Sequence, residues 1–291
     1  MPTKKKDIPY PADMLAALRS LESAPARAEA PRAEARGVAS LTFAQPAARA
    51  MPAEEAVVVR IPFVPPTGGP GFNILRTHRV DPKDPPALAA LMTLEGVRAL
   101  AASGGDNFTG TARRASKITI ADAPMEEFAD LKDLLATLPS HSFMRNHQPP
   151  INAQSAQSKR VKEEKRNVRV HAFLYAASRE SDRDYHLIIG RDPNADSEVY
   201  MNVEISGLPP ANSNAFPKLK AARDAYKKFF KDRLPGTSYD FYSEAPFPVI
   251  IEGSLFWDAS HATGQKPGPK DLRPKIPTVW EIHPITRIKF K

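Results

Sequence analysis

Four residues near the end of the chain carry side chains that could bind a metal ion or move protons. Asp258 and His261 lie in the segment FWDASH, and Glu281 and His283 stand two residues apart in WEIHPIT. Carboxylates and imidazoles act as metal ligands and as general acids or bases, so these four residues are candidates for the centre of a metal-dependent hydrolase. A Glu-x-His pair at the end of a strand also occurs as a hydrogen-bonded structural anchor, and this alternative stays open.

The residue types that are missing restrict the chemistry further. The chain has 291 residues and no cysteine, which excludes disulfides, thiolate nucleophiles, iron–sulfur clusters and cysteine zinc sites. It also contains no HExxH, Walker, GxSxG or dinucleotide-binding motif. We therefore predict no cofactor, and a divalent metal only under the hydrolase hypothesis.

A second group of residues fits nucleic-acid binding. Residues 167–178 alternate with a period of two, which predicts a strand with two different faces. One face holds Val168, Val170, Ala172, Leu174 and Ala176, and the other holds Arg169, His171, Phe173 and Tyr175. The same alternation adds His186, Tyr200, Asn202 and Glu204 from the next two strands. Aromatic and basic side chains on one face could stack bases and neutralise phosphates, or the aromatic rings could pack against the preceding region.

These candidates depend on a predicted order of five strands and one helix. The expected strands cover 167–178, 184–190, 198–206, 249–257 and 279–290, with a helix over 215–232. The order β-β-β-α-β-β is that of an OB-like Greek-key barrel, in which the helix caps one end. We expect the last strand to meet the first and close the barrel, and the rival is an open α+β sheet.

The chain before the barrel predicts two further parts. Residues 1–56 are rich in Ala and Pro, which favours a disordered arm with a possible short helix after Asp13. Residues 57–160 predict an α+β lead-in that packs on the barrel of residues 161–291. Its expected elements are strands over 57–64 and 72–80, helices over 85–102 and 122–139, a solvated loop at Arg113-Arg114-Ala-Ser116, and a polar linker over 145–160.

The charge of the chain suits an anionic partner. Lys and Arg outnumber Asp and Glu by 41 to 33, which gives a net charge of +8. No apolar run is long enough to span a membrane or to form a signal peptide, so we expect a cytoplasmic protein without a membrane span.

Several of these motifs resemble a widespread group of uncharacterised bacterial proteins. The resemblance covers residues 167–291 through DYHLII, the strand with Glu204, FWDASH and WEIHPIT, and extends upstream through FNILRTHRVD and ADAPMEEFADLKDLL. Proteins of that group end in a loop with a hydrophobic-D-x-x-H pattern and an EIHPV-type strand. The resemblance implies common ancestry and an OB-like C-terminal region, but no reaction. The acidic ligands and paired arginines of the OB-fold nucleases find no matching positions here.

Three functional hypotheses follow from the sequence. The first is a binding module for single-stranded nucleic acid on the aromatic and basic barrel face. The second is a metal-dependent hydrolase that uses Asp258, His261, Glu281 and His283. The third is an assembly or adaptor protein that binds a protein partner through residues 1–56.

Overall fold

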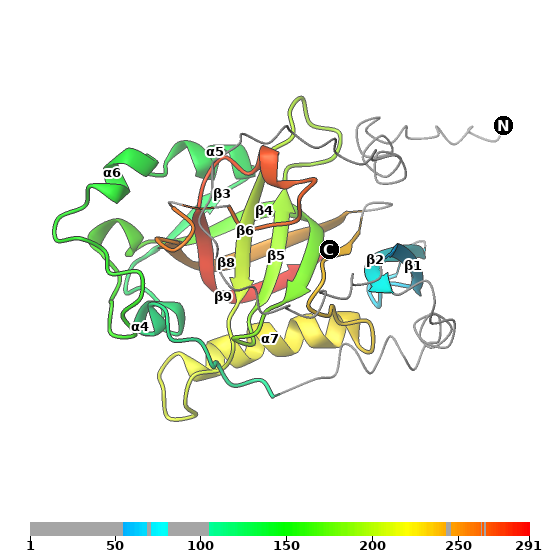
Figure 1. Ribbon diagram of the computed structural model, residues 1–291, viewed down its shortest axis with the longest axis horizontal. Coiled ribbons are helices and arrows are strands. Elements are labelled where there is room, and N and C mark those ends of the chain that lie inside the picture. Colours follow the sequence, from blue (N-terminus) through cyan, green and yellow to red (C-terminus); the bar gives the residue numbers. More distant parts are fainter. Residues whose placement is uncertain (1–54, 69–70, 81–104, 243–245, 263, 265) are drawn as a thin grey trace, which may run out of the picture. The chain divides into compact units, whose positions relative to one another are not determined.

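The computed structural model describes residues 55–68, 71–80, 105–242, 246–262, 264 and 266–291 (Figure 1). The chain divides into two compact units, residues 1–52 and residues 53–291, and everything described belongs to the second. The predicted arm, apart from its last two residues, and the predicted helix over 85–102 lie outside the described residues.

Five strands form a closed barrel with one helix inserted between the third and fourth. They are β4 (Asn167–Arg179), β5 (Tyr185–Gly190), β6 (Tyr200–Ile205), β8 (Phe247–Trp257) and β9 (Trp280–Phe290), and the helix is α7 (Phe216–Phe230). A two-residue strand, β7 (Asp240–Phe241), lies between α7 and β8. The predicted five-stranded barrel and its element order are therefore confirmed, with β7 as an addition.

The barrel closes in a different place from the one predicted. Antiparallel pairs join β4 to β5 and β5 to β6, and β9 runs parallel to β6 at Val203 and Ile282. The ring is completed by β8, which pairs with β9 and with β4 from Asn167↔Ser254 to Leu174↔Phe247. The fourth strand, not the last, thus meets the first.

A β-bulge in β4 changes which side chains face the barrel interior. Leu174 pairs with Ile189 and Ala176 with Ile188, so two residues of β4 oppose one step of β5. Val168, Val170, Ala172 and Leu174 point into the main core as predicted, but after the bulge Ala177 takes the inward position. Ala176 packs outside it with Ile188 and Tyr200, so the prediction for Ala176 was wrong.

An aromatic cluster fastens α7 to the barrel. The Phe229 and Phe290 rings stack with centroids 3.7 Å apart, and the Phe230 ring lies 5.5 Å from Phe63 and 5.9 Å from Phe247. Helix α7 carries its apolar residues on one side because they recur at helical spacing. It runs across one end of the barrel strands (Figure 1).

A hairpin precedes the barrel, as the sequence predicts, and it pairs with β7. It consists of β1 (Glu55–Phe63) and β2 (Phe72–Val80), whose Leu75 and Arg76 pair with β7. The guanidinium of Arg76 makes a buried ion pair of 2.5 Å with Asp240. This pair fixes the register between the hairpin and β7.

The segment predicted as one helix over 122–139 begins as a strand. Strand β3 (Met125–Phe128) pairs in parallel with β4, and α5 (Leu131–Ala136) follows, with the Asp130 carboxylate accepting from the Lys132 amide at 2.8 Å. The Asp130 cap therefore sets the start of the helix, while Met125–Phe128 pair with β4 as an edge strand. The remaining short elements are α4 (Arg114–Lys117), α6 (His141–Arg145), η1 (Lys162–Glu164) and η2 (Arg273–Lys275).

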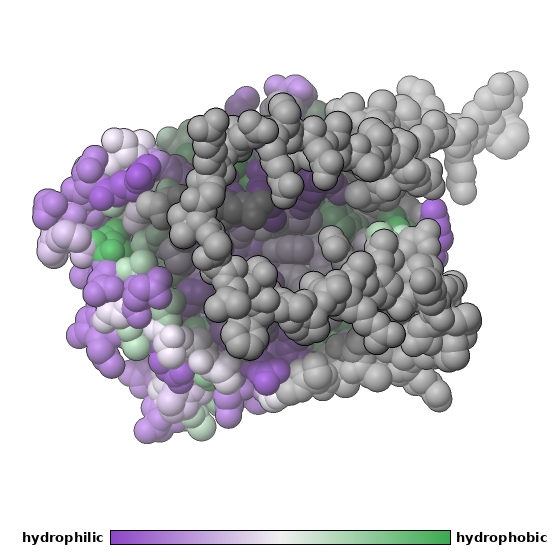
Figure 2. Space-filling view, in the orientation of Figure 1, coloured by the Kyte–Doolittle hydropathy of each residue, from purple (hydrophilic) through white to green (hydrophobic). Residues whose placement is uncertain are grey.

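Few large apolar side chains are exposed among the described residues. They are Val58, Val64, Met125 and Phe143. On the face shown in Figure 2, the described surface is mostly hydrophilic.

We predict that Phe230→Ala lowers the free energy of unfolding by about 3–5 kcal/mol, because it empties a fully buried ring position in the aromatic cluster. Urea denaturation followed by circular dichroism measures this change. Phe143→Ala removes the same ring from a side chain that is 55% exposed and is expected to change stability by less than about 0.5 kcal/mol. Equal losses in the two variants would contradict the assignment of Phe230 to the core.

Candidate functional site

Three adjacent strands bring polar side chains to one outer face of the barrel. Leu187, Val203 and Ile282 of β5, β6 and β9 face the core, so the residues next to them point the other way. The register places His186 opposite Glu204 and Val203 beside Ile282. The resulting polar cluster consists of Asp184, His186, Asn202, Glu204, Glu281 and His283.

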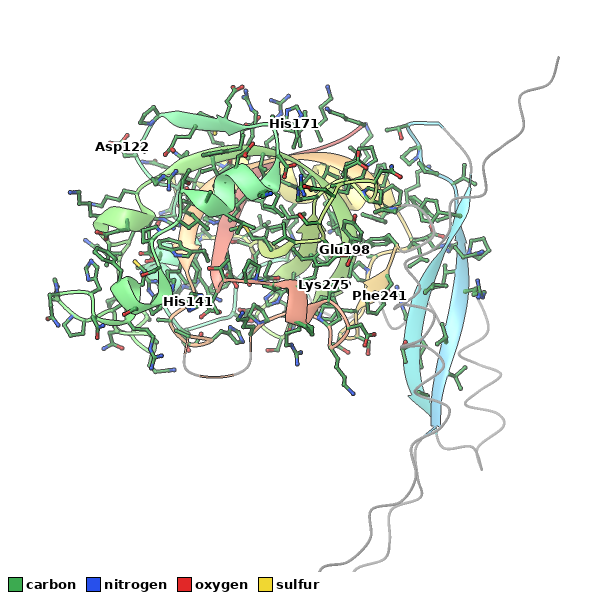
Figure 3. All side chains as sticks on the ribbon, turned by 90° about the horizontal axis from the view of Figure 1, so that it is seen from above. Asp122, His141, His171, Glu198, Phe241 and Lys275 are labelled. Carbon is green, nitrogen blue, oxygen red and sulfur yellow. The ribbon has the colours of Figure 1, made fainter. Side chains whose placement is uncertain are left out.

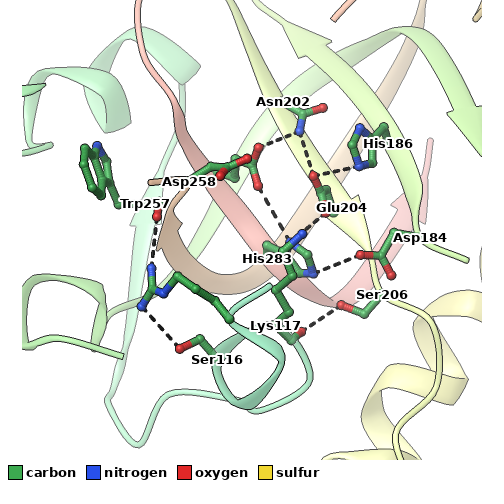
Figure 4. Close-up of polar contacts among 12 residues, drawn as sticks. Ser116, Lys117, Asp184, His186, Asn202, Glu204, Ser206, Trp257, Asp258 and His283 are labelled. Carbon is green, nitrogen blue, oxygen red and sulfur yellow. Dashed lines mark hydrogen bonds and ion pairs between the residues drawn. The ribbon is translucent and has the colours of Figure 1, made fainter. Parts of the chain in front are cut away.

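Hydrogen bonds and ion pairs link the β5 and β6 members of the polar cluster (Figure 4). His186 Nε2 lies 2.9 Å from Glu204 Oε1. The Asn202 amide donates to Glu204 Oε1 at 3.0 Å and to Glu281 Oε1 at 2.8 Å. Oε1 of each glutamate therefore accepts a hydrogen bond from Asn202, and Oε2 of each faces His283.

The remaining donor and acceptor atoms converge around His283. Its Nδ1 lies 2.7 Å from Glu204 Oε2 and 3.7 Å from Glu281 Oε2, and its Nε2 lies 3.4 Å from Asp184 Oδ2. The contact between Nδ1 and Glu204 Oε2 is a short ion pair, whereas Glu281 Oε2, Asp184 Oδ2 and His283 Nε2 are buried without a hydrogen-bond partner among the described residues. Leaving a buried polar atom unpaired costs about 1–3 kcal/mol. Three such atoms in one place therefore leave the hydrogen-bonded network incomplete.

The same atoms fit a metal ion. Asp184, Glu204 and His283 each offer one ligand atom, and these three atoms lie within 4.8 Å of one another. Metal ions bind carboxylate oxygens and imidazole nitrogens at about 2.0–2.2 Å, so one ion can reach all three. Two oxygens and one nitrogen form a ligand set that suits Zn²⁺ or Mn²⁺.

Electrostatics also favour a cation in the polar cluster. Burial and neighbouring carboxylates raise the pKa of Asp184 and Glu281 well above their usual ranges. Burial would also raise the pKa of Glu204, but the charges of His186, His283 and Lys117 hold it well below its usual range. Burial alone would lower the pKa of His186, yet Glu204 raises it to about 9.

Two residues of the site were not predicted from the sequence. Asp184 immediately precedes β5 and lies on the same face as His186, so the alternation in DYHLII contained its signal. Its Oδ1 accepts from the Gly207 amide at 2.5 Å. Lys117 ends α4, in a segment whose sequence gave no indication of the site, and its backbone oxygen accepts from Ser206 Oγ at 2.9 Å.

The four predicted catalytic residues form two separate pairs. Glu281 and His283 lie together in the polar cluster, whereas the Asp258 carboxylate binds His261 Nδ1 and accepts from the Ser260 amide at 2.9 Å. Asp258 lies close enough to Glu281 for its charge to raise the pKa of that residue. The predicted set of four thus shares only His283 with the group of three possible ligands.

His261 is the accessible member of the second pair. Its side chain is 38% exposed, while that of Asp258 is 6% exposed. The hydrogen bond that His261 donates to Asp258 raises the pKa of His261 above its usual range, and the charges of Glu204 and His186 also act on it. Burial would raise the pKa of Asp258, but His261 and Ser260 lower it to about 2.

The predicted nucleic-acid face separates into three places. His186 and Asn202 lie in the polar cluster. The rings of Tyr175 and Tyr200 contact edge to face at 4.9 Å, and the Tyr175 hydroxyl donates to the Arg191 backbone oxygen.

The third place is on β4. Arg169 pairs with Glu252 at 2.9 Å and also with Glu127. His171 and Phe173 line a cavity of about 210 Å³, and Figure 3 marks the position of His171.

Buried arginines hold the strand ends that carry the site. Arg113 pairs with Glu164 at 2.6 Å and donates to the Trp257 backbone oxygen, and the Trp257 amide donates to Glu164. Arg160 donates to the His283 backbone oxygen at 2.7 Å. The expectation of a solvated loop at Arg113 was wrong, and the polar segment over 145–160 packs through Arg160, because backbone oxygens at these strand ends need donors.

The loop before β9 is fastened to the loop before β6. Lys275 forms an ion pair with Glu198, as Figure 3 locates them. The Val279 amide, just before β9, donates to His141 Nε2 at 3.3 Å. These contacts hold in place the loop that leads into β9, the strand that carries Glu281 and His283.

Comparison with known proteins gave no match to a protein-family model, to a curated protein or to a solved structure. Among the described residues, no helix has the length and apolarity needed to cross a bilayer. Any function must therefore be argued from the site itself.

Breaking the Arg113–Glu164 pair is expected to cost about 3–5 kcal/mol of unfolding free energy, because Arg113→Met leaves a buried carboxylate unpaired. Adding Glu164→Gln removes that charge, keeps an acceptor for the Trp257 amide and should recover part of the loss. Chemical denaturation of both variants measures this. As a control, Lys220→Met breaks an exposed ion pair with Asp224 and should cost at most about 1 kcal/mol. If the double variant Arg113→Met, Glu164→Gln is no more stable than Arg113→Met alone, the ion pair does not account for the loss.

We predict that Asp258→Asn lowers the pKa of His261 toward its ordinary value of 6.5, because the hydrogen bond to Asp258 is the largest cause of its elevation. NMR titration of the imidazole carbons measures this pKa. In the wild type the raised pKa means that the pair stabilises the fold below about pH 6.5 and loses this effect as the pH rises through the folded-state pKa. An unchanged pKa in the variant would show that Asp258 does not act on His261.

Proposed function

We propose that the protein is a metal-dependent hydrolase whose divalent ion is held by Asp184, Glu204 and His283. The observation that carries this proposal is that one buried ligand atom from each of Asp184, Glu204 and His283 lies within 4.8 Å of the others, with Asp184 Oδ2 and His283 Nε2 left without a hydrogen-bond partner among the described residues. Of the four predicted residues only His283 is a proposed ligand, while Glu281 contacts His283 and Asp258 and His261 form a separate pair.

The Asp258–His261 pair supports hydrolysis over simple metal storage. Asp258 orients the imidazole through Nδ1, which leaves Nε2 without a hydrogen-bond partner among the described residues. A carboxylate that holds an imidazole in one orientation is the usual arrangement for a general base. Because His261 is also the partly exposed member of the pair, water can reach it.

The proposed reaction conserves atoms and protons as follows. A bound divalent ion would polarise the bond under attack and lower the pKa of a nearby water. His261 accepts a proton from the attacking water as its oxygen bonds to the electrophilic atom of the substrate. The bond to the leaving group then breaks, and His261 returns the proton to that group.

The position of the polar cluster agrees with an OB-like barrel. OB-folds generally bind ligands on the face of their second and third strands, which correspond to β5 and β6. This analogy supports the location of the site and carries no argument about the reaction.

Contacts of the described residues favour this proposal over binding of single-stranded nucleic acid. Arg169 is neutralised by two carboxylates, and the Tyr175 hydroxyl and ring both have partners inside the protein. His186 and Asn202 are bound within the polar cluster. The residues expected to bind phosphates and bases are therefore already engaged.

Metal binding tests the proposal directly. We predict that metal-stripped protein binds one Mn²⁺ or Zn²⁺ and that Asp184→Asn weakens binding by more than about 100-fold, since losing even an outer-shell partner costs about 10- to 100-fold. Isothermal titration calorimetry measures the affinity. Asp224→Asn, an exposed carboxylate on α7, is the matched control and should bind as the wild type does.

Hydrolysis is tested with chromogenic phosphate and carboxylate esters in the presence of the same ion. The expected activity disappears on chelation, in Asp184→Asn and in His261→Asn, while His261→Asn still binds the metal. Stoichiometric metal binding without any dependence on Asp184, or turnover that survives chelation, would contradict the proposal.

A further inference from the structure

Lys117 is a buried cation without a hydrogen-bond partner for its ammonium group among the described residues. Its side chain is 13% exposed, and the ion-pair contact of its Nζ is with Asp182 Oδ2 at 3.8 Å, beyond hydrogen-bond distance. An ammonium has three N–H donors and normally uses them. The donors of Lys117 are therefore available to a ligand.

The carboxylates of the polar cluster act on this ammonium. Burial would lower the pKa of Lys117, but the charges of Glu204, Asp184 and Glu281 raise it. The Nζ lies 5.8 Å from the centre of the Phe256 ring, and the Phe256 ring lies 5.4 Å from the ring of His283. Lys117 thus approaches the proposed metal site from a helix rather than from the strands that would hold the ion.

The charge balance points to an anionic ligand. One divalent ion, the Lys117 ammonium and the protonated His186 carry four positive charges against the three carboxylates of the polar cluster, so an anion that enters meets a net positive charge. Without the ion, the site loses the cationic point that would face one oxygen of the anion. Anion binding should therefore depend on the metal.

A phosphoryl group fits these two points better than a carboxylate does. It has several non-bridging oxygens in a tetrahedral arrangement, so one can face a metal ion while another accepts from a lysine, as in many phosphoryl-transfer sites. We infer that the substrates are phosphate esters and that Lys117 donates to a non-bridging phosphoryl oxygen. This inference rests on the proposed metal-dependent hydrolysis.

For a phosphate ester the balanced step is simple hydrolysis. The water oxygen forms a bond to phosphorus, and the bond from phosphorus to the ester oxygen breaks. The proton that His261 takes from the water goes to the departing alcohol. Lys117 keeps its proton throughout and stabilises the charge on the phosphoryl oxygens.

The test uses inorganic phosphate as the probe on full-length, Mn²⁺-loaded protein. Thermal unfolding should shift upward with phosphate for the loaded protein and not for the metal-free protein. Lys117→Gln should weaken phosphate binding at least about 10-fold while Mn²⁺ binding persists, and Lys117→Arg should restore part of it. Lys220→Gln, an exposed lysine on α7, is the matched control and should behave as the wild type.

A second measurement needs no variant of Lys117. If phosphate binds beside the ion, the ³¹P relaxation of phosphate should rise sharply with wild-type protein and Mn²⁺, well above Mn²⁺ with the metal-binding variant Asp184→Asn. Relaxation equal in the two samples would overturn the inference even if Lys117→Gln fails to fold.

The outcomes separate the inference from the proposed function. Absence of metal binding by the wild type would reject the hydrolase itself. Metal binding with phosphate affinity unchanged in Lys117→Gln would reject the role of Lys117 alone. Acetate that binds as tightly as phosphate and competes with it would reject the phosphate-ester class and leave the metal centre standing.

Discussion

Three buried carboxylates that lie close together are the constraint around which this barrel is organised. Glu204 and Glu281 belong to β6 and β9, Asp184 immediately precedes β5, and all three are at most 1% exposed. Desolvating one carboxylate costs several kcal/mol unless partners compensate. His186, Asn202, Lys117 and the Gly207 amide supply part of that compensation, and the unpartnered atoms that remain are the reason to propose a cation.

The segment before the barrel completes the site instead of merely preceding it. It supplies Lys117 to the polar cluster, and Arg113 and Arg160 to the backbone of the strands that carry Asp258 and His283. A barrel strand alone would leave those end carbonyls without donors. The position of the catalytic candidates therefore depends on residues far away in the sequence.

Sequence patterns predicted the barrel because each strand alternates with a period of two over its own length. The face shared by His186, Asn202 and Glu204 followed from the same local rule. The bulge before Ala176 did not, because it appears only when β4 is paired with β5. The burial of Arg113 and the place of Lys117 near the site were missed for the same reason, because their neighbours come from segments tens of residues away. A basic residue in a sequence gives no sign of whether it is solvated or packed in a core.

The close contact between Gly207 and Phe108 limits how the chain can be divided. A side-chain carbon at Gly207 would lie 2.6 Å from the Phe108 backbone, and a bridge joins Asn107 to Leu208 next to it. The segment that leads to Lys117 thus packs against the end of β6 with no room for even a methyl group. A recombinant fragment that starts at residue 161 would keep all five barrel strands, yet it would lack this packed segment and expose the polar cluster to water.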